Sequence, residues 1–232
     1  PENVKLQIVQ PYDQTPIAGI ETDDAAALER KLRTARDLFA NRDRWLKPHE
    51  RVAVLRRLAE LMEGRREHFA MQIAREGGKP LADARIEAVR AIDGVRNAAD
   101  ELRTFSGREI PMGLSPASDG RWAFTTREPI GVVAAISAFN HPLNLIVHQI
   151  VPAIAAGCPV IVKPAEATPL SCLDLVALVR EAGLPEAWCQ TLITADTALA
   201  ERLATDPRIA FLSFIGSARV GWYLHSRLAP GV

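Results

Sequence analysis

The sequence predicts an α/β fold in which helices cover both faces of a parallel sheet. Two observations carry this prediction. From residue 129 onward, short and wholly apolar runs alternate with helical segments, as in proteins with buried parallel strands. Before that point, apolar side chains recur at intervals of three and four, which is typical of helices that pack on a core.

The N-terminal segment, residues 1–108, is expected to be helical. Asp23 or Asp24 can cap a first helix, because a carboxylate accepts hydrogen bonds from the free N–H groups of a first turn. Pro48 suits the first position of a second helix, and the glycine pair 77–78 can end that helix. A third helix then continues to about residue 102.

A turn-rich stretch follows the helices. Pro111, Pro116 and the pair Asp119-Gly120 favour turns, and residues 122–128 alternate like a strand. Residues 109–128 are therefore expected to form a β-hairpin that projects from the main body. Because an isolated hairpin is only marginally stable in water, its strands are expected to find partners, for example in another subunit.

Residues 129–232 are expected to contain four strands joined by helices. The predicted strands are residues 130–136, 159–162, 189–193 and 209–214, and the predicted helices are residues 143–156, 168–181, 197–204 and the segment from 217. Right-handed crossovers place the loops after parallel strands at one edge of the sheet, where open α/β sheets bind ligands. The loops of interest are residues 137–142, 163–169 and 214–221.

Each of these loops carries groups suited to a ligand. Gly216 lets backbone N–H groups approach a phosphate, and Ser217 can cap the next helix. Lys163 and Glu166 can together bind the hydroxyls of a ribose, and the amide of Asn140 can donate to a developing oxyanion. Taken singly, each also has a purely structural interpretation: a strand-to-helix turn, a surface ion pair and a turn before proline.

Composition excludes several classes of protein. The 232 residues are 48% hydrophobic and 24% charged, which excludes a disordered chain. Lys and Arg balance Asp and Glu at 28 each, so we expect no nucleic-acid partner, and we interpret the basic surplus of residues 30–67 as solvated helix faces. The apolar segment 145–162 is interrupted by Pro and Gly, so no membrane span is expected. Three cysteines without a short spacing, and no visible signal peptide, favour the reducing cytoplasm.

Four segments, in this order, resemble the NAD(P)-dependent aldehyde dehydrogenase superfamily: PIGVVAAISAFNHPL, VIVKPAEATPL, AGLPEAW and FLSFIGSARVG. The segment EGGKPLADARIEAV at residues 76–89 is similar to the family's N-terminal helical part. The resemblance implies a Rossmann-like cofactor domain at residues 129–232, a helical segment at residues 1–108 packed on it, and an oligomerisation hairpin at residues 109–128. It also implies NAD or NADP as cofactor, an aldehyde as substrate, and a homodimer or homotetramer.

The resemblance further implies roles for individual residues. Asn140 matches the family's oxyanion-hole asparagine and is the catalytic residue expected in this chain. Lys163 and Glu166 match residues that contact the cofactor ribose. The remaining cofactor contacts are Ile136 and Ser137 at the nicotinamide side, Gly216 and Ser217 beneath the pyrophosphate, Val220 beside the adenine, and Phe139.

The chain departs from the family's pattern at four places. His141 stands where an aromatic residue is usual, and Ala138 where proline is common. Ile215 replaces a common threonine, and Ala195 stands where the family often has a glycine-bearing adenine loop. These departures leave the choice between NAD and NADP open.

The family's reaction uses a cysteine nucleophile and a carboxylate general base. Both lie in motifs C-terminal to residues 214–221, so we expect them, and the catalytic domain, beyond the end of this chain, and we expect the 232 residues alone to be inactive. Cys158, Cys172 and Cys189 are interpreted as packed structural residues, and no metal site is expected. The alternative is a non-catalytic module that binds a dinucleotide or assembles subunits through the hairpin.

Overall fold

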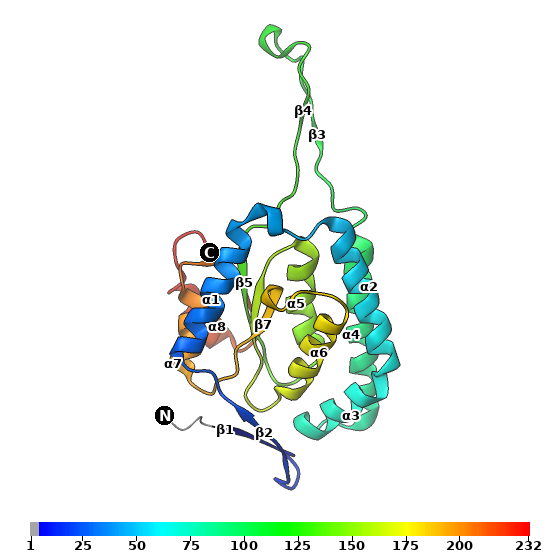
Figure 1. Ribbon diagram of the computed structural model, residues 1–232, viewed down its shortest axis with the longest axis vertical. Coiled ribbons are helices and arrows are strands. Elements are labelled where there is room, and N and C mark those ends of the chain that lie inside the picture. The colour runs from blue at the N-terminus through cyan, green and yellow to red at the C-terminus, as the bar shows by residue number, and fades with distance from the viewer. Residues whose placement is uncertain (1–4) are drawn as a thin grey trace.

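The structure is a computed structural model that describes residues 5–232; residues 1–4, the start of the predicted helical segment, lie outside the described part. Its centre is a parallel sheet of four strands in the order β7-β6-β5-β8 (Figure 1). The strands are β5 (Val132–Ile136), β6 (Val160–Lys163), β7 (Cys189–Thr191) and β8 (Ile209–Phe214). Each begins and ends within two residues of its predicted run, so the predicted α/β fold is confirmed.

Helices cover both faces of the sheet. Successive residues of β5 point to opposite faces. Val133 and Ala135 pack into a core with α5 and α6, whereas Val132 and Ala134 pack with α1 and α7. The helices are α1 (Ala25–Ala40), α2 (Pro48–Gly64), α3 (Arg66–Gly77), α4 (Leu81–Glu101), α5 (Asn144–Ala156), α6 (Leu170–Glu181), α7 (Thr197–Thr205) and α8 (Ala218–His225), with short 3-10 turns at Arg42–Arg44, Pro116–Ser118 and Glu186–Trp188.

A layer of helices, α2 to α4, packs outside α5 and α6 (Figure 1). The prediction of one helix over residues 48–77 was wrong, because the chain breaks at Arg65, where φ is −117° and ψ is 19°. The break directly follows Gly64, and glycine weakens a helix because its backbone is the most flexible. Gly78 ends α3 in the left-handed conformation, with φ of 63°, as predicted.

The N-terminus was predicted to be helical, and this prediction was wrong for the described residues before α1. β1 (Lys5–Val9) and β2 (Pro16–Glu21) form an antiparallel hairpin, with Gln14 in the left-handed region of its turn. In β1, Leu6 and Ile8 alternate with polar residues, which fits a period of two, and Ile8 is only 1% exposed. Of the two predicted caps, Asp24 is the residue that caps α1, accepting from the backbone of its first turn.

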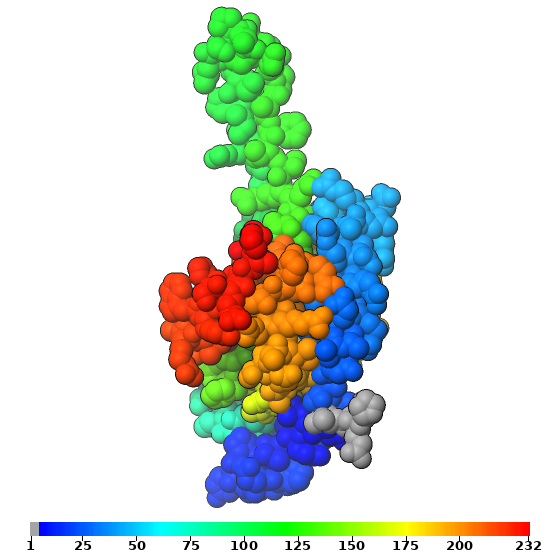
Figure 2. All heavy atoms as spheres, turned by 90° about the vertical axis from the view of Figure 1, so that its left-hand side faces the viewer, coloured from blue at the N-terminus to red at the C-terminus, as the bar shows by residue number. Residues whose placement is uncertain are grey.

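The predicted projecting hairpin is present. Its strands β3 (Glu109–Ile110) and β4 (Ala123–Phe124) are antiparallel and only two residues long, and the hairpin stands clear of the body in both views (Figures 1 and 2). Leu114 and Trp122 are each 86% exposed, and Phe124 is 76% exposed. A partner for these side chains remains a prediction. Within residues 5–232, no helix is both long and apolar enough to cross a lipid bilayer.

Candidate functional site

Three strands of the sheet end side by side at its carboxyl edge. In the strand register, Ile136 of β5 lies opposite Lys163 of β6 on one side and Phe214 of β8 on the other. Pairing continues just past the strands, since the N–H of Ser137 donates to the carbonyl of Lys163 at 3.0 Å and the N–H of Ile215 to that of Ile136 at 2.9 Å. The loops that follow therefore start from a fixed edge.

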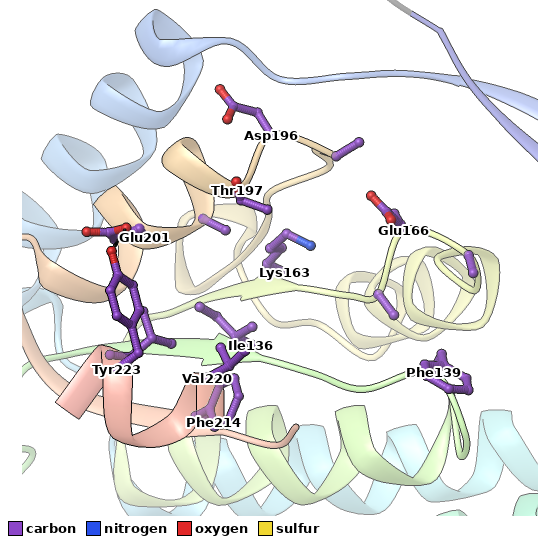
Figure 3. A pocket seen from close by; sticks show the side chains of 15 residues that line it. Ile136, Phe139, Lys163, Glu166, Asp196, Thr197, Glu201, Phe214, Val220 and Tyr223 are labelled. Carbon is purple, nitrogen blue, oxygen red and sulfur yellow. Dashed lines mark hydrogen bonds between the residues drawn. The ribbon is translucent and has the colours of Figure 1, made fainter. Parts of the chain in front are cut away.

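A pocket of about 550 Å³ opens at this edge, beside α7 and α8 (Figure 3). Among the predicted site residues, those that line the pocket are Ile136, Phe139, Lys163, Glu166 and Val220. They come from the ends of two strands, two loops and a helix that are distant in sequence. The parallel sheet is what brings them together, as expected for an open α/β fold.

Lys163 and Glu166 supply charged groups to the pocket. The Nζ of Lys163 donates to the carbonyl of Pro164 at 3.2 Å. Burial lowers the pKa of this ammonium group, and the nearby carboxylate of Glu166 opposes that shift. Figure 3 shows the amine extending toward the loop that carries Glu166. A donor and an acceptor placed in this way can bind two adjacent hydroxyl groups.

Residues of α7 and α8 complete the pocket, and the sequence analysis missed most of them. The hydroxyl of Tyr223 donates to Glu201 Oε2 at 2.8 Å and so joins the two helices (Figure 3). The periodicity of α8 was a usable signal, because residues three and four places after Val220 lie on the same helix face. The other lining residues are Ala165, Ala167, Ala195, Asp196, Thr197, Ala200, Phe214 and Leu224.

The turn that begins α8 is shaped by the ring of Phe214. A Cβ atom at Gly216 would lie 2.5 Å from the Cζ of Phe214, closer than non-bonded atoms approach, so this ring position requires glycine. Ser217 caps α8, since its Oγ accepts from the N–H of Val220 at 3.4 Å. Gly216 and Ser217 are exposed and lie outside the pocket wall, at the positive end of the helix dipole.

Asn140 and Ser137 also lie outside the pocket wall. Asn140 is exposed on the loop between β5 and α5. Ser137 is 7% exposed, and its Oγ has no hydrogen-bond partner among residues 5–232. Lys163 at the end of β6 and Glu166 in the loop after it therefore lie at a different place along this edge of the sheet from the predicted catalytic amide of Asn140.

The three cysteines are buried and free. Burial raises the pKa of Cys189 to about 12 and that of Cys172 well above its ordinary value, which disfavours the reactive thiolate. None of the three lines the pocket beside Lys163. Their packing agrees with the structural role assigned from the sequence. In the described part of the chain, no cluster of three or more His, Cys, Asp or Glu side chains is placed to hold a metal ion.

Comparison with known proteins identifies the family. The family model for the aldehyde dehydrogenase family matches residues 1–231. The chain is 37% identical to the 3-sulfolactaldehyde dehydrogenase of Priestia megaterium over 223 residues, which are 96% of this chain and 46% of that protein. It superposes on aldehyde dehydrogenase 21 of Physcomitrella patens, solved with the product succinate, with a TM-score of 0.91 and 31% identity over 97% of this chain and 47% of that one.

NAD(P)-dependent enzymes are among these relatives. The NADP complex of glyceraldehyde-3-phosphate dehydrogenase from Methanocaldococcus jannaschii superposes with a TM-score of 0.87 and 29% identity, covering 97% of this chain and 49% of that one. The chain spans about half the length of the curated relatives it matches. The resemblance carried by the four loop segments is thus confirmed, and this chain belongs to the aldehyde dehydrogenase family.

Proposed function

We propose that this chain forms the cofactor-binding part of an enzyme that oxidises an aldehyde to a carboxylic acid with NAD or NADP. The observation that carries the proposal is the pocket at the carboxyl edge of the sheet, where Lys163 and Glu166 lie beside apolar walls from α7 and α8. This combination suits a dinucleotide, whose ribose hydroxyls need polar partners and whose adenine ring needs an apolar surface. Membership of the aldehyde dehydrogenase family supports the same reaction.

The residues present fit such a cofactor. In the proposal, Lys163 and Glu166 bind the ribose hydroxyls and Val220 packs beside the adenine, with Ala200 and Leu224 adding apolar surface. Gly216 and Ser217 lie beneath the pyrophosphate, because the first N–H groups of α8 lack partners within the helix and attract an anion. The contacts at the nicotinamide side are assigned to Ile136, Ser137 and Phe139.

Bound NAD(P) supplies the hydride acceptor, and the residues of this chain hold and polarise the reactants. The side-chain amide of Asn140 is assigned to donate a hydrogen bond to the oxyanion that forms when a cysteine thiolate attacks the aldehyde carbonyl. The buried positions of Cys158, Cys172 and Cys189 support a nucleophile elsewhere in the full-length protein. We assign that cysteine, and the carboxylate that activates water for thioester hydrolysis, to a catalytic domain outside these 232 residues, and we expect these residues alone to be inactive.

We propose a division of the chain close to the one the sequence suggested: an N-terminal segment at 1–108 that carries the β1–β2 hairpin followed by the helices α1 to α4, a projecting hairpin at 109–128 and the cofactor domain at 129–232. The packing of α2 to α4 against α5 and α6 supports it. The three free cysteines support a cytoplasmic location, because thiols stay reduced there.

Cofactor titration of the full-length protein tests the proposed function. We expect the protein to bind NADH more tightly than NADPH, because the carboxylate of Glu166 repels a 2′-phosphate when it accepts from the ribose hydroxyls. Glu166→Gln removes this charge, and we expect it to narrow the ratio of the two dissociation constants by about fivefold, the effect of roughly 1 kcal/mol between solvated charges. The measurement is the quenching or enhancement of nicotinamide fluorescence.

The matched control is Glu21→Gln, which removes an exposed carboxylate from β2 and should leave the ratio unchanged. Failure of the wild-type protein to bind either dinucleotide would contradict the proposed function. If Glu166→Gln leaves the ratio of the NADH and NADPH dissociation constants unchanged, Glu166 does not contact the ribose 2′-hydroxyl. That result would not contradict the proposed function.

We also propose that the full-length protein is a homodimer or homotetramer assembled through residues 109–128. Support comes from Leu114, Trp122 and Phe124, which are mostly exposed on a hairpin that projects from the body. Exposed apolar side chains grouped in this way indicate an interaction surface. We expect Trp122→Ser combined with Phe124→Ser to lower the mass measured by sedimentation, whereas Tyr12→Ser, at a residue that is 97% exposed on the other hairpin, should not. A monomeric wild-type protein would contradict this proposal.

A further inference from the structure

Two buried glutamates of the outer helical layer accept hydrogen bonds from the first residues of α5 and α6, two helices that pack on the sheet. Glu76 of α3 is 1% exposed and accepts from the first residues of α6. Glu87 of α4 is 2% exposed and accepts from the first residues of α5. Only α5 follows the loop that carries Asn140, so Glu87 lies near the predicted catalytic residue in the sequence and Glu76 does not.

Each oxygen of Glu87 has its own partners. Oε1 accepts from the N–H of Leu143 at 3.0 Å and from the N–H of Asn144 at 3.1 Å. Oε2 pairs with the Nζ of Lys79 at 2.5 Å and lies 3.3 Å from the Nδ1 of His141. The Nζ of Lys79 lies 2.9 Å from the same Nδ1 atom. One carboxylate therefore joins α4, the ring of His141 and the first turn of α5.

Asn140 is close in sequence to the residues that Glu87 contacts. It directly precedes His141 and comes three residues before Leu143, while its own side chain is exposed. The loop is held at its other end by the N–H of Ser137, which donates to the carbonyl of Lys163 at 3.0 Å. Both ends of the loop are thus tied to the protein, one at the sheet and one at Glu87.

Gln149 of α5 ties this helix to the sheet. The Nε2 of Gln149 donates to the carbonyl of Ile136 at 3.0 Å and to that of Ser213 at 2.8 Å, so α5 is fastened to the ends of β5 and β8. With α5 fixed to the sheet, the position of its first turn depends on what holds its free N–H groups. Glu87 accepts from the first two of these groups, those of Leu143 and Asn144, and the carbonyl of His141 accepts from the next at 3.0 Å.

We propose that Glu87, set in place by Lys79, is a positioning residue for Asn140. Its carboxylate holds the first turn of α5 and the adjacent His141, and thereby fixes where the amide of Asn140 can donate to the oxyanion. This inference rests on the proposed function, because it takes Asn140 as the oxyanion donor. Small displacements of a donor reduce its effect on the rate strongly, since the stabilisation depends on distance and direction.

Glu87→Gln separates this role from simple helix capping. The amide oxygen of glutamine can still accept from the N–H groups of Leu143 and Asn144, but its NH2 group faces the ammonium of Lys79 and loses the ion pair. We expect kcat of the full-length enzyme to fall about tenfold, with the aldehyde KM and the NADH dissociation constant within a factor of about three of wild type. Glu76→Gln is the matched control: it neutralises the equivalent carboxylate at α6 and should leave kcat unchanged.

A double-mutant cycle provides the readout that a merely structural role would not move. If Glu87 acts through Asn140, Glu87→Gln should have no further effect on kcat when Asn140 is already alanine. If the two substitutions instead lower kcat independently, so that their factors multiply in the double variant, the proposal is overturned. An unchanged kcat in Glu87→Gln alone would overturn it as well.

Lys79→Met keeps the proposal testable should Glu87→Gln fail to fold, because it leaves Glu87 and its two N–H donors intact. Lys79→Met should lower kcat when Asn140 is present and should have no effect on kcat when Asn140 is already alanine. Any other pattern would overturn the proposal. A wild-type enzyme that oxidises no aldehyde would overturn the proposed function itself, which distinguishes the two failures.

Discussion

Replacing Asn140 by alanine in the full-length enzyme should lower kcat by about 10² to 10³, which corresponds to roughly 2.7–4 kcal/mol of barrier. The amide donates to charge that develops only after the thiolate attacks, so its loss raises the barrier without weakening the binding of the ground state. In the proposed function Asn140 contacts the oxyanion and not the cofactor, so the dissociation constant for NADH should not change. Steady-state kinetics and cofactor titration together check both expectations.

Asn97→Ala is the matched control for this variant. Asn97 is an exposed asparagine of α4, so it has the same chemistry without the proposed role, and its removal should leave kcat as in wild type. A kcat within twofold of wild type for Asn140→Ala would remove Asn140 from the mechanism. A weakened NADH affinity with unchanged kcat would instead assign this residue to cofactor binding.

The elements that form the site could be predicted from local patterns, but their meeting point could not. Apolar runs located β5, β6 and β8, and the rule for parallel sheets placed their following loops at one edge. The adjacency of Ile136 to both Lys163 and Phe214 depends on strand order and register, which arise from tertiary packing. For the same reason the ring of Phe214 beneath Gly216 has no signature in the sequence.

Buried charges were the other feature that the sequence did not reveal. Glu76 and Glu87 belong to the amphipathic helices α3 and α4, in which a glutamate is normally on the solvated side. Their burial depends on the N–H groups at the starts of α5 and α6, which have no partner within their own helix and donate to these carboxylates. Those N–H groups are far from the glutamates in the sequence. The N-terminal hairpin β1–β2 was missed for a different reason: its strands are short, and a run of five or six residues is a weak signal beside long helices.

The burial of Glu76 predicts an unusual dependence of stability on pH. Burial raises the pKa of this carboxyl group to about 7, against the opposing effect of donors from Ser171 and Leu170. Because the folded state binds the proton more tightly than the unfolded chain, whose glutamate has a pKa near 4.5, the stabilisation is complete below that value. It is lost as the pH rises through about 7. Between pH 5 and pH 8 the free energy of unfolding should fall by roughly 2–3 kcal/mol through this group.

Glu76→Gln should abolish that part of the pH dependence, because glutamine does not titrate and resembles the protonated acid. Every other ionisable group is common to the two proteins, so the difference between their unfolding free energies at each pH isolates Glu76. We expect the variant to be less stable than or equal to wild type at pH 5 and to gain on it steadily up to pH 8, as measured by urea unfolding. Glu21→Gln, which neutralises an exposed carboxylate, should instead give a curve parallel to that of wild type. A parallel curve for Glu76→Gln would mean that the hydrogen bonds from Leu170 and Ser171 outweigh the cost of burial, and that the carboxylate caps α6 in its charged form throughout this range.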